Sequence, residues 1–595
     1  MNPVVTGALS ATLALTLSPF AQAQDVKFTE PLSTPTEFIQ TSTTAKAIAR
    51  QEELFHWLTA SRHGDPTAAF SLHLTAQDLR DIGAGEPATG ELRANPRRVQ
   101  VGVDKPLGSS LNFANLAGKS LRGAAPFEGG VAGEGLDGDL VWSAVAQSEG
   151  ASGLRLGFTD FQLPAGAALY VYNSRGEAFG PYTGRGPNGD GEFWSNTISG
   201  DRVTLQLHHF GRRDRATLSA MGFTLASISH MGPRLPLTDI LGQEDTEKAF
   251  CSYNNSEGCV MPGSEGGAEV SEAKKAVALM IYTSGGGSYI CSGGLLADTD
   301  SGSTIPYFLT ANHCISKGRE AKSLETVFDF DGDCSDRYGN GNYPNRTNGS
   351  SIKSSNRTSD YTLLELNQEP GGTRAYLGWT NAPVAFSGGD ALYRISHPAG
   401  APQAYSHHTV DTSTGTCTSW PRGSWIYSYD QIGATEGGSS GSPVLNAAGL
   451  VVGQLSGACG TNVNNTCDRD NNATVDGALA AYWSAVEPFL APGDPPPPPP
   501  NGDATVQGVV VSVVSQGPWN RGQATVTVVD GNGNPVANAS VLGTFSGDVS
   551  GSASGTTDAS GVAVIRSGRT RSNINSVGFC VDTVNGSAAT GNTCG

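Results

Sequence analysis

The stretch Thr435–Pro443 reads Thr-Glu-Gly-Gly-Ser-Ser-Gly-Ser-Pro, and the interpretation of the whole chain starts from it. Within it, Gly438-Ser439-Ser440-Gly441 has the form Gly-x-Ser-Gly, whose glycines permit a tight turn. Such a turn exposes a serine hydroxyl and directs neighbouring backbone N–H groups outward. The pattern predicts a nucleophilic serine at Ser440, although Gly/Ser turns are common in a chain with 78 glycines among 595 residues.

Two upstream stretches supply the partners that a serine nucleophile needs. Tyr307–Cys314 is an apolar strand that runs into a histidine, His313, beside a cysteine. Ser359–Leu366 places Asp360 at the mouth of another apolar strand. A histidine braced by a carboxylate can take the proton from a serine hydroxyl, so the three stretches together predict a nucleophilic centre.

Length and charge limit the possible functions. A chain of 595 residues is long enough for several domains, each with its own core. Its formal net charge of −18 and pI of about 5.0 argue against a phosphate-rich partner, because no basic face could dominate such a surface. Nucleic acid is therefore not an expected partner.

The cysteines and the first residues indicate export. All ten cysteines lie from Cys251 onward, an even number that is typical of disulfides in an oxidising compartment. Residues 4–20 are largely apolar, and Ala21-Gln22-Ala23 has the small-x-small form of a cleavage site, which predicts a signal peptide over residues 1–23. No other run reaches the roughly 20 apolar residues of a bilayer span, so a secreted, extracellular protein without a membrane span is expected.

The segment 24–248 is predicted to be a propeptide. It contains a plausible helix at 45–60 and becomes β-rich from about residue 99, with short alternating strands such as 154–158, 168–172 and 202–207 that suggest a β-sandwich. It lacks cysteine and precedes the predicted nucleophilic centre, so it is expected to assist folding and to block the site. The alternative is an accessory binding domain that stays attached. The polar stretch before Cys251 favours processing after Lys248.

Residues 249–490 are expected to form an all-β double barrel with one terminal helix. The predicted strands lie at 276–283, 289–296, 305–311, 325–330, 361–366, 392–396, 425–429 and 450–455. The helix is predicted over 477–490, because Leu479, Trp483, Val486 and Leu490 recur at helical spacing.

The remaining residues are divided by a proline run. Residues 491–502 contain six consecutive prolines and are expected to be a stiff spacer. Residues 503–595 carry short strands and resemble bacterial immunoglobulin-like domains, with Cys580 and Cys594 expected to pair. A binding or tethering role and a passive stabilising role are equally compatible with this segment.

The ordered motifs around Cys291–Leu296, His313, Asp360–Asn367, Ser440 and Gly453–Leu455 resemble those of the bacterial lysyl-endopeptidase branch of the chymotrypsin-like serine proteases. The resemblance implies that Ser440 attacks the scissile carbonyl, that His313 carries the proton and that Asp360 orients His313. The backbone N–H groups of Gly438 and Ser440 would form the oxyanion hole. Ser439 carries no charge, so activation is expected to depend on removal of the propeptide.

Substrate preference is less clearly marked. The trypsin pocket acid is replaced by Ala434, and the position used by lysyl endopeptidases is Thr474, which is neutral. Asp476 shares a strand face with Thr474, and Glu436 matches a glutamate of the lysyl-endopeptidase motif; either carboxylate would favour Lys or Arg. Ser456 and Gly457 complete the predicted substrate-binding set. The alternatives are a preference for small or apolar residues, or an inactive secreted adhesin.

By resemblance, Cys291 would pair with Cys314 and Cys259 with Cys334. Cys251 would pair with Cys459 or Cys467, and Cys417 with the other of the two. The acidic clusters 329–333 and 468–472 lack the glycine and glutamate of an EF-hand loop and are interpreted as solvated turns, so no metal or cofactor is expected. The expected partners are protein or peptide substrates and the chain's own propeptide, in a monomer.

Overall fold

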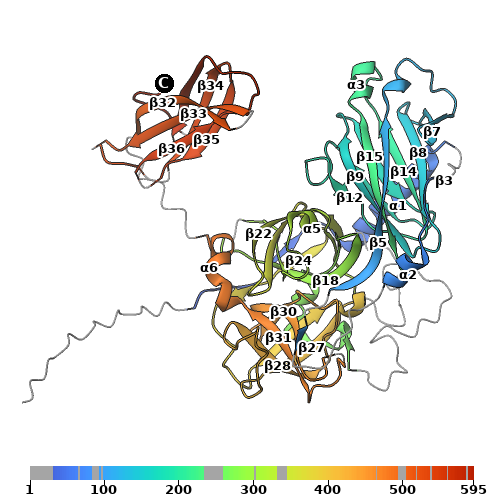
Figure 1. Cartoon of the computed structure of the whole chain (residues 1–595), viewed down its shortest axis with the longest axis vertical. Helices are drawn as coiled ribbons and strands as arrows, with labels where there is room; N and C mark the ends of the chain where they lie inside the picture. Colours follow the sequence, from blue (N-terminus) through green and yellow to red (C-terminus); the bar gives the residue numbers. More distant parts are fainter. Residues whose placement is uncertain are drawn as a thin grey trace, which may run out of the picture.

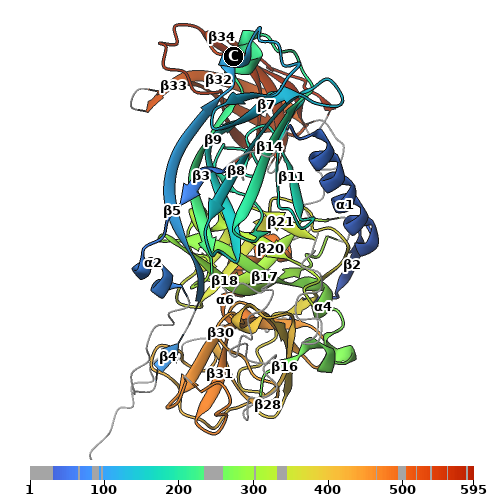
Figure 2. The same ribbon diagram turned by 90° about the vertical axis from the view of Figure 1, so that its right-hand side faces the viewer.

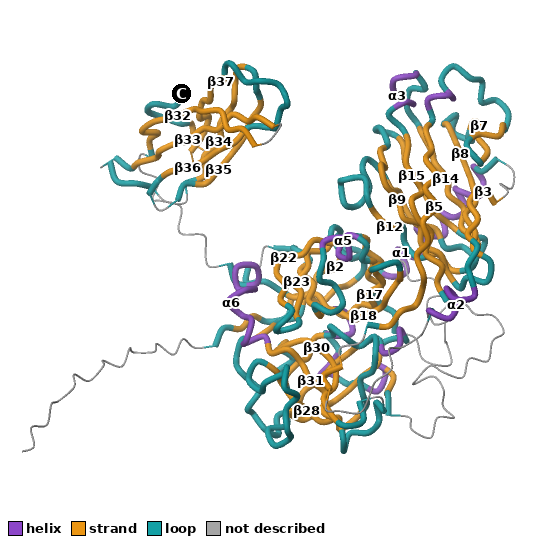
Figure 3. Tube along the Cα trace, viewed as in Figure 1, coloured by secondary structure: helices purple, strands orange, loops and turns teal. Residues whose placement is uncertain are grey.

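The computed structural model is built almost entirely of strands (Figures 1 and 3). It describes residues 31–595 except 64–67, 83–92, 96–97, 233–258, 301–302, 332–344, 464, 493–503, 517–518, 532, 537–538, 559 and 585–586. The predicted signal peptide, the Lys248 processing site and most of the proline spacer lie outside the described residues. The all-β expectation is confirmed.

The N-terminal part forms two facing sheets around one core. One sheet has the order β11-β10-β14-β8-β7-β6, with β3 parallel to β8, and the other includes β12, β9, β15 and β5. Trp142 from the first sheet and Phe158 from the second are both buried in the shared core. The strands are β3 (Ala68–Leu72), β5 (Val99–Asn112), β6 (Ala125–Phe127), β7 (Gly130–Glu134), β8 (Leu140–Ser148), β9 (Gly153–Gln162), β10 (Ala167–Tyr172), β11 (Ala178–Tyr182), β12 (Phe193–Trp194), β13 (Ile198–Ser199), β14 (Arg202–His209) and β15 (Gly222–Met231).

Short elements connect this part to the rest. They are β1 (Ser33–Thr34), β2 (Glu37–Gln40), α1 (Thr44–Ser61), α2 (Ala76–Asp81), β4 (Arg93–Asn95) and α3 (Arg215–Ser219). The helix predicted at 45–60 is confirmed as α1, which begins after the N-cap Thr43, whose side chain accepts from the backbone N–H of Lys46.

The long strand β5 joins the N-terminal part to the following barrel. It pairs with β15 on one side and, through its first residues, with β18 (Gly287–Leu296), so that one 12-stranded sheet runs through both parts (Figure 2). A buried ion pair lies beside this junction: Arg155 Nε is 3.7 Å from Glu325 Oε2, and both side chains are fully buried. The two parts therefore share sheet hydrogen bonds and a matched pair of charges.

The first barrel is a ring of strands. β18 pairs with β17 and β19, β17 with β20, β20 with β21, β19 with β23 and β23 with β22; β21 and β22 are separated only by Gly349. These strands are β17 (Val277–Ser284), β19 (Tyr307–Ala311), β20 (Glu325–Val327), β21 (Arg346–Asn348), β22 (Ser350–Asn356) and β23 (Tyr361–Leu366), with the short elements β16 (Met261–Pro262), α4 (Ala273–Ala276), α5 (Gly318–Lys322) and β24 (Thr373–Tyr376) around them.

The second barrel closes completely. The pairings run β30-β29-β26-β27-β28-β31, and β31 returns to β30. The strands are β26 (Ala391–Ser396), β27 (Ala404–Val410), β28 (Trp425–Ile432), β29 (Pro443–Asn446), β30 (Val451–Gly460) and β31 (Asn472–Ala478), with β25 (Trp379–Thr380) added beside β30. The double barrel predicted for this region is present.

The predicted terminal helix is confirmed as α6 (Leu479–Leu490), and its four predicted apolar residues are buried. It begins two residues later than expected, because residues 477 and 478 still pair with β30. Strand β27 was not predicted, because two adjacent histidines interrupt its apolar pattern. Strand β31 contains Thr474 and Asp476, which were expected on one strand face.

The C-terminal part contains two sheets, β32-β33-β36 and β35-β34-β37-β38, around a core that includes Val526 and Phe579. Its strands are β32 (Thr505–Gln516), β33 (Trp519–Val529), β34 (Ser540–Gly547), β35 (Gly551–Thr556), β36 (Val562–Arg566), β37 (Val577–Val584) and β38 (Ser587–Ala588). Among the described helices, none is long and apolar enough to span a bilayer.

The disulfides correct one predicted pairing. Cys291–Cys314 and Cys580–Cys594 are formed as predicted, and Cys417 pairs with Cys459, one of the two partners considered for it. Cys259 pairs with Cys467, 208 residues away, so the predicted Cys259–Cys334 bond is wrong. With Cys467 taken by Cys259 and Cys459 by Cys417, the partner predicted for Cys251 is excluded as well. Cys251 and Cys334 themselves lie outside the described residues.

Candidate active site

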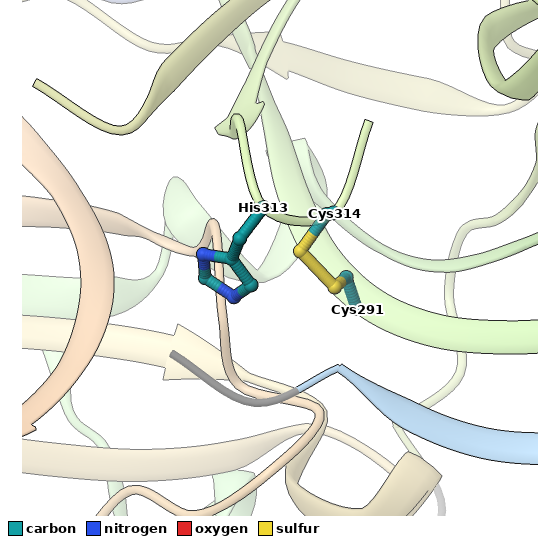
Figure 4. A group of neighbouring side chains, drawn as sticks. All are labelled: Cys291, His313 and Cys314. Atoms are coloured by element: carbon teal, nitrogen blue, oxygen red, sulfur yellow. A yellow bond between two sulfur atoms is a disulfide. The ribbon is translucent and has the colours of Figure 1, made fainter. Parts of the chain in front are cut away.

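His313 lies just beyond β19, where the chain leaves the first barrel. The whole of β19 is buried, and the next residue, Cys314, is tied to β18 by its disulfide to Cys291. Figure 4 shows the His313 ring beside this disulfide. The backbone N–H of Asn312 donates to the Asp360 carbonyl at 3.0 Å, which holds the histidine loop against the start of β23. The side chain of His313 is 14% exposed.

Asp360 contacts His313 through both carboxylate oxygens. Oδ1 accepts from the His313 backbone N–H at 2.8 Å, and Oδ2 lies 2.7 Å from His313 Nδ1. Because a carboxylate only accepts, Nδ1 carries the proton and donates it, which leaves the lone pair on Nε2. The backbone of Asp360 has φ of 49°, a conformation that non-glycine residues adopt rarely and that is concentrated at functional sites.

Two further residues fix Asp360 in place. Gln454 Nε2 donates to the carbonyls of Asp360 at 3.0 Å and Ser359 at 3.2 Å, and Gln454 Oε1 accepts from the hydroxyl of Tyr482 on α6 at 2.5 Å. Sequence reasoning assigned no role to either. The sequence contained one sign of this role: Gln454 lies among the apolar residues at the start of β30, and a buried amide needs hydrogen-bond partners.

Ser440 lies on the predicted glycine turn between the barrels. Gly438 and Gly441 have φ of 99° and 84°, which a side chain would strain, and a Cβ at Gly441 would lie 2.2 Å from Thr310 Oγ1. The Ser440 carbonyl accepts from the N–H of Ser292 on β18 at 2.8 Å. Gly441 N–H donates to the carbonyl of Leu455 on β30 at 2.8 Å. The turn is thus held by a strand of each barrel.

The second ring nitrogen of His313, Nε2, has no hydrogen-bond partner among the described residues. Nε2 is buried and makes no hydrogen bond, while Cys314, the next residue, has its sulfur 3.8 Å from the Ser440 carbonyl. Hydrogen bonds of catalytic bases are often long before substrate binds and then tighten, so this geometry leaves Nε2 able to accept a proton from a neighbouring hydroxyl. The arrangement supplies an oriented base with a free lone pair beside a serine turn.

Of the predicted pocket residues, Ala434, Ser456 and Gly457 carry no charge, whereas Thr474 contacts an acidic residue. Ala434 and Ser456 are buried, and Gly457 follows Ser456 on β30; the Ser456 hydroxyl makes no hydrogen bond. Thr474 donates through Oγ1 to Asp430 Oδ1 at 2.9 Å. Asp430 keeps 16% side-chain exposure and was not predicted.

The carboxylate of Asp476, which was predicted to favour Lys or Arg substrates, is paired with a cation of the chain itself. Asp476 is fully buried, and its Oδ1 accepts from Arg394 Nη2 at 2.6 Å. Burial raises the pKa of Asp476, an effect that the Arg394 charge opposes. Asp430 is the more exposed of the two acids, and its Oδ1 lies 2.7 Å from Nδ1 of the buried His408.

Glu436 is a carboxyl group without a partner beside the serine turn. Its Oε1 is buried and unbonded, and burial raises its pKa to about 7. Because the folded-state pKa lies above that of an unfolded glutamate, the folded state is favoured at low pH and this contribution is lost as pH rises through about 7.

Replacing Glu436 by glutamine is therefore expected to raise the melting temperature at pH 8 and to have little effect at pH 5. The variant removes an ionisation that costs about 3 kcal/mol at the higher pH, because each pKa unit between 4.5 and about 7 corresponds to about 1.4 kcal/mol. Melting curves of Glu436→Gln and its parent, both carrying Ser440→Ala to prevent self-digestion, would measure the effect. An equal difference at both pH values would show that Glu436 does not titrate in this range.

One group of metal-type ligands lies within this site, among the described residues: Cys291, His313 and Cys314, whose ligand atoms lie within 4.8 Å of one another. The two sulfurs are joined at 1.98 Å, so neither is a thiolate, and these residues do not fit a metal ion (Figure 4). Asp329, the first residue of the acidic cluster 329–333, is ion-paired with the buried Arg374. The interpretation of this residue as part of a solvated turn is therefore wrong.

The chain is similar in sequence to known proteins. The family model "Lysyl endopeptidase, C-terminal domain" matches residues 254–473. Lysyl endopeptidase of Pseudomonas aeruginosa is 28% identical over 326 residues, which are 53% of this chain and 66% of that protein, slightly under two thirds of its length. Secreted RxLR effector protein 73 of Plasmopara viticola is 25% identical over 320 residues, 50% of this chain and 72% of that protein. The solved structure of the HtrA-type protease AlgW with tripeptide is 15% identical and covers 51% of this chain and 95% of that one, with a TM-score of 0.26.

Proposed function

We propose that this chain is a secreted serine endopeptidase, since its residues 254–473 match the model of the lysyl endopeptidase C-terminal domain. The observation that carries the proposal is the hydrogen bond between His313 Nδ1 and Asp360 Oδ2, which leaves Nε2 as a base beside the Ser440 turn. Protein or peptide substrates and a monomeric enzyme are part of the proposal.

In this mechanism Ser440 Oγ attacks the scissile carbonyl while His313 Nε2 takes the hydroxyl proton. Asp360 stabilises the positively charged imidazole that results. The same proton is then delivered to the leaving amine, the C–N bond breaks, and an acyl ester remains on Ser440. A water molecule, deprotonated by His313, hydrolyses the ester and restores the serine.

The developing oxyanion would be bound by the backbone N–H groups of Gly438 and Ser440. Gly438 has φ of 99°, and a Cβ there would lie 2.7 Å from the His397 carbonyl. The turn that carries these N–H groups therefore requires glycine at this position. Each such donor is worth about 3–4 kcal/mol of transition-state stabilisation in other serine proteases.

The test of the proposed reaction is covalent labelling. A fluorophosphonate is expected to label the mature enzyme at Ser440 and to leave Ser440→Ala unlabelled. The competing function is a secreted adhesin whose protease domain is inactive. Failure of the properly folded mature protein to react would support that alternative.

The proposed preference is for Lys or Arg before the scissile bond, with Asp430 as the recognising acid. Asp430 is bonded to Thr474, which pairs with Ala458 on β30, directly after the predicted substrate-binding residues. Glu436 is a second acid on the serine side, and its unpaired Oε1 would gain from a substrate cation. The alternative is a preference for small or apolar side chains.

Asp430→Asn is expected to lower kcat/KM for Arg and Lys substrates by about 10- to 100-fold, while substrates with an uncharged residue at this position change little. The loss corresponds to one hydrogen bond to a charged group, about 1.5–3 kcal/mol. Cleavage of a peptide library by the two enzymes measures it, with the exposed Asp390→Asn as matched control. An unchanged preference for basic residues would exclude Asp430 as the pocket acid.

The N-terminal domain is proposed to act as propeptide, inhibitor and folding aid. Its support is the interface with the first barrel: β5 extends the barrel sheet, and Glu325 accepts from Thr197 Oγ1 of the N-terminal domain at 2.6 Å. Burial raises the pKa of Glu325, but the charges of Arg346 and Arg155 outweigh it and hold the pKa below its usual value. A buried, charged interface of this kind favours one docked arrangement.

A further inference from the structure

The positive charge of the C-terminal part is gathered in one place. Residues 503–595 contain four arginines and no lysine, and three of these arginines line one hollow of about 240 Å³, whose lining residues are Val514, Trp519, Arg521, Arg566 and Arg569. The fourth, Arg571, has its guanidinium 4.6 Å from the centre of the Trp519 ring. None of the aspartates described in this part lines the hollow, so this surface, which we call the arginine hollow, is basic in a chain of net charge −18.

The arginine hollow lies on the outer face of the sheet β32-β33-β36 (Figure 1). Along β33, Ala524 is buried in the core between the two sheets, and successive side chains of a strand alternate between its faces. Trp519 and Arg521 therefore lie on the face away from the core, where Arg521 pairs with Val514 of β32. The hollow is thus formed by side chains on a sheet face and not by an open strand edge.

The charges around the hollow have no acidic partners among the described residues. Arg566 donates from Nε to Gln523 Oε1 at 2.9 Å. Arg521 and Arg569 make neither a hydrogen bond nor an ion pair with any residue that the structure describes. Because like charges that line one hollow repel each other, a bound anion would stabilise this arrangement.

The side chains indicate what kind of ligand would bind. A guanidinium presents a planar pair of N–H donors that matches a carboxylate, and the Trp519 ring offers a flat apolar surface beside them. A hollow of about 240 Å³ is smaller than the pockets of about 300 Å³ and above that enclose a drug-sized ligand, so it would hold part of a longer molecule. A sugar ring that bears a carboxylate meets these requirements, and an acidic polysaccharide repeats that ring along its chain.

Two other kinds of polyanion fit the hollow less well. An acidic peptide that binds in extended form adds a strand to a sheet edge, whereas the hollow lies on a sheet face. Single-stranded nucleic acid is bound by several aromatic rings, on which successive bases stack. Trp519 is the only aromatic residue of 503–595 outside the core, because Phe545 and Phe579 are buried. One ring is enough for a single sugar of a polysaccharide.

We propose that the arginine hollow binds an acidic polysaccharide, with Arg521, Arg566 and Arg569 on its carboxylates and Trp519 against one sugar ring. The proposal assigns the C-terminal part a binding role, which goes beyond the proposed peptidase function. Through this site the enzyme would be retained on surfaces that carry such a polymer.

The test uses the full-length chain with Ser440→Ala, which prevents self-digestion, and polygalacturonate as the probe. Calorimetric titration at low salt is expected to show binding that weakens as salt is added, because salt screens exposed charges. The fully methyl-esterified polymer has the same sugar backbone without the charge. It should bind about 10-fold more weakly or worse, since it cannot accept charge-assisted hydrogen bonds.

The variants test the residues themselves. Arg521→Gln combined with Arg569→Gln is expected to raise Kd by about 10-fold or more. Neither arginine has a partner among the described residues, so the double variant should melt at the same temperature as its parent. Arg319→Gln is the matched control: it makes the same change of charge at an exposed residue of α5 and should leave Kd unchanged.

Several results would show that the inference is wrong: absence of binding, equal binding of the esterified polymer, or an unchanged Kd of the double variant. Tighter binding of a single-stranded oligothymidylate, lost in the double variant, would also contradict it, because the hollow would then be a nucleic-acid site. Hydrolysis of peptides by the chain that retains Ser440 enters none of these measurements, so the proposed function is judged separately.

Discussion

Ser440→Ala is expected to lower kcat by about 10⁶-fold, the loss found when the nucleophile of a serine protease is removed. Without Oγ no acyl ester can form, and His313 has no hydroxyl to deprotonate. Only transition-state binding by the Gly438 and Ser440 N–H groups would remain, which gives a small residual rate over water. Single-turnover hydrolysis of a chromogenic ester by the purified mature enzyme measures the loss.

Ser442→Ala is the matched control. It lies on the same turn and is fully buried, and its hydroxyl makes no hydrogen bond, so its removal leaves no partner unsatisfied. Its activity should stay within a few-fold of wild type. Comparable activity in Ser440→Ala would mean that another group is the nucleophile, and comparable loss in Ser442→Ala would mean that the turn itself had been disrupted.

Asp360→Asn is expected to lower kcat by about 10⁴-fold at neutral pH, the loss seen for the same change in a well-studied triad. The two contacts of Asp360 explain the direction. The His313 backbone N–H needs an acceptor, so the amide oxygen of asparagine would turn to it, and the amide NH₂ would then face Nδ1. Nδ1 must accept instead of donate, so the proton moves to Nε2, which can no longer take one from Ser440.

Asparagine should leave the fold intact, because it tolerates the left-handed conformation that Asp360 adopts at φ of 49°. A melting temperature close to that of wild type, together with the large rate loss, would show that the substitution changes the tautomer of His313 and not the fold. The exposed Asp390→Asn serves as control for the same chemical change. A loss of less than 10-fold at neutral pH would show that Asp360 does not orient the base.

The elements that carry the predicted centre could be located from the sequence, because each of them is marked by a local pattern. The apolar strands that end at His313 and begin after Asp360 are present as β19 and β23, and the glycines around Ser440 have the positive φ values that such a turn requires. The geometry joins His313 to Asp360 directly. It also adds Gln454 and Tyr482 behind them, which the sequence reasoning overlooked.

The pocket was predicted less well, for a physical reason. Strand alternation correctly set Asp476 and Thr474 on one face, but the charge state of a buried acid depends on its partner. That partner, Arg394, is 82 residues away in the chain and contacts Asp476 only because β26 and β31 belong to the same closed barrel. The partner predicted for Cys259 was wrong for the same reason, because its actual partner, Cys467, is 208 residues away in the chain.

By itself, the sequence determined which residues form strands and turns, and therefore where an imidazole, a carboxylate and a hydroxyl are displayed, since these depend on neighbours a few positions apart. Only the tertiary structure decided which distant groups meet: the acid that contacts Arg394, the cysteine that Cys259 reaches, and the register that pairs β4 with β30 and β5 with β18. Those contacts follow from barrel closure and strand pairing between segments that lie 82 or more residues apart, and no local pattern in the chain encodes them.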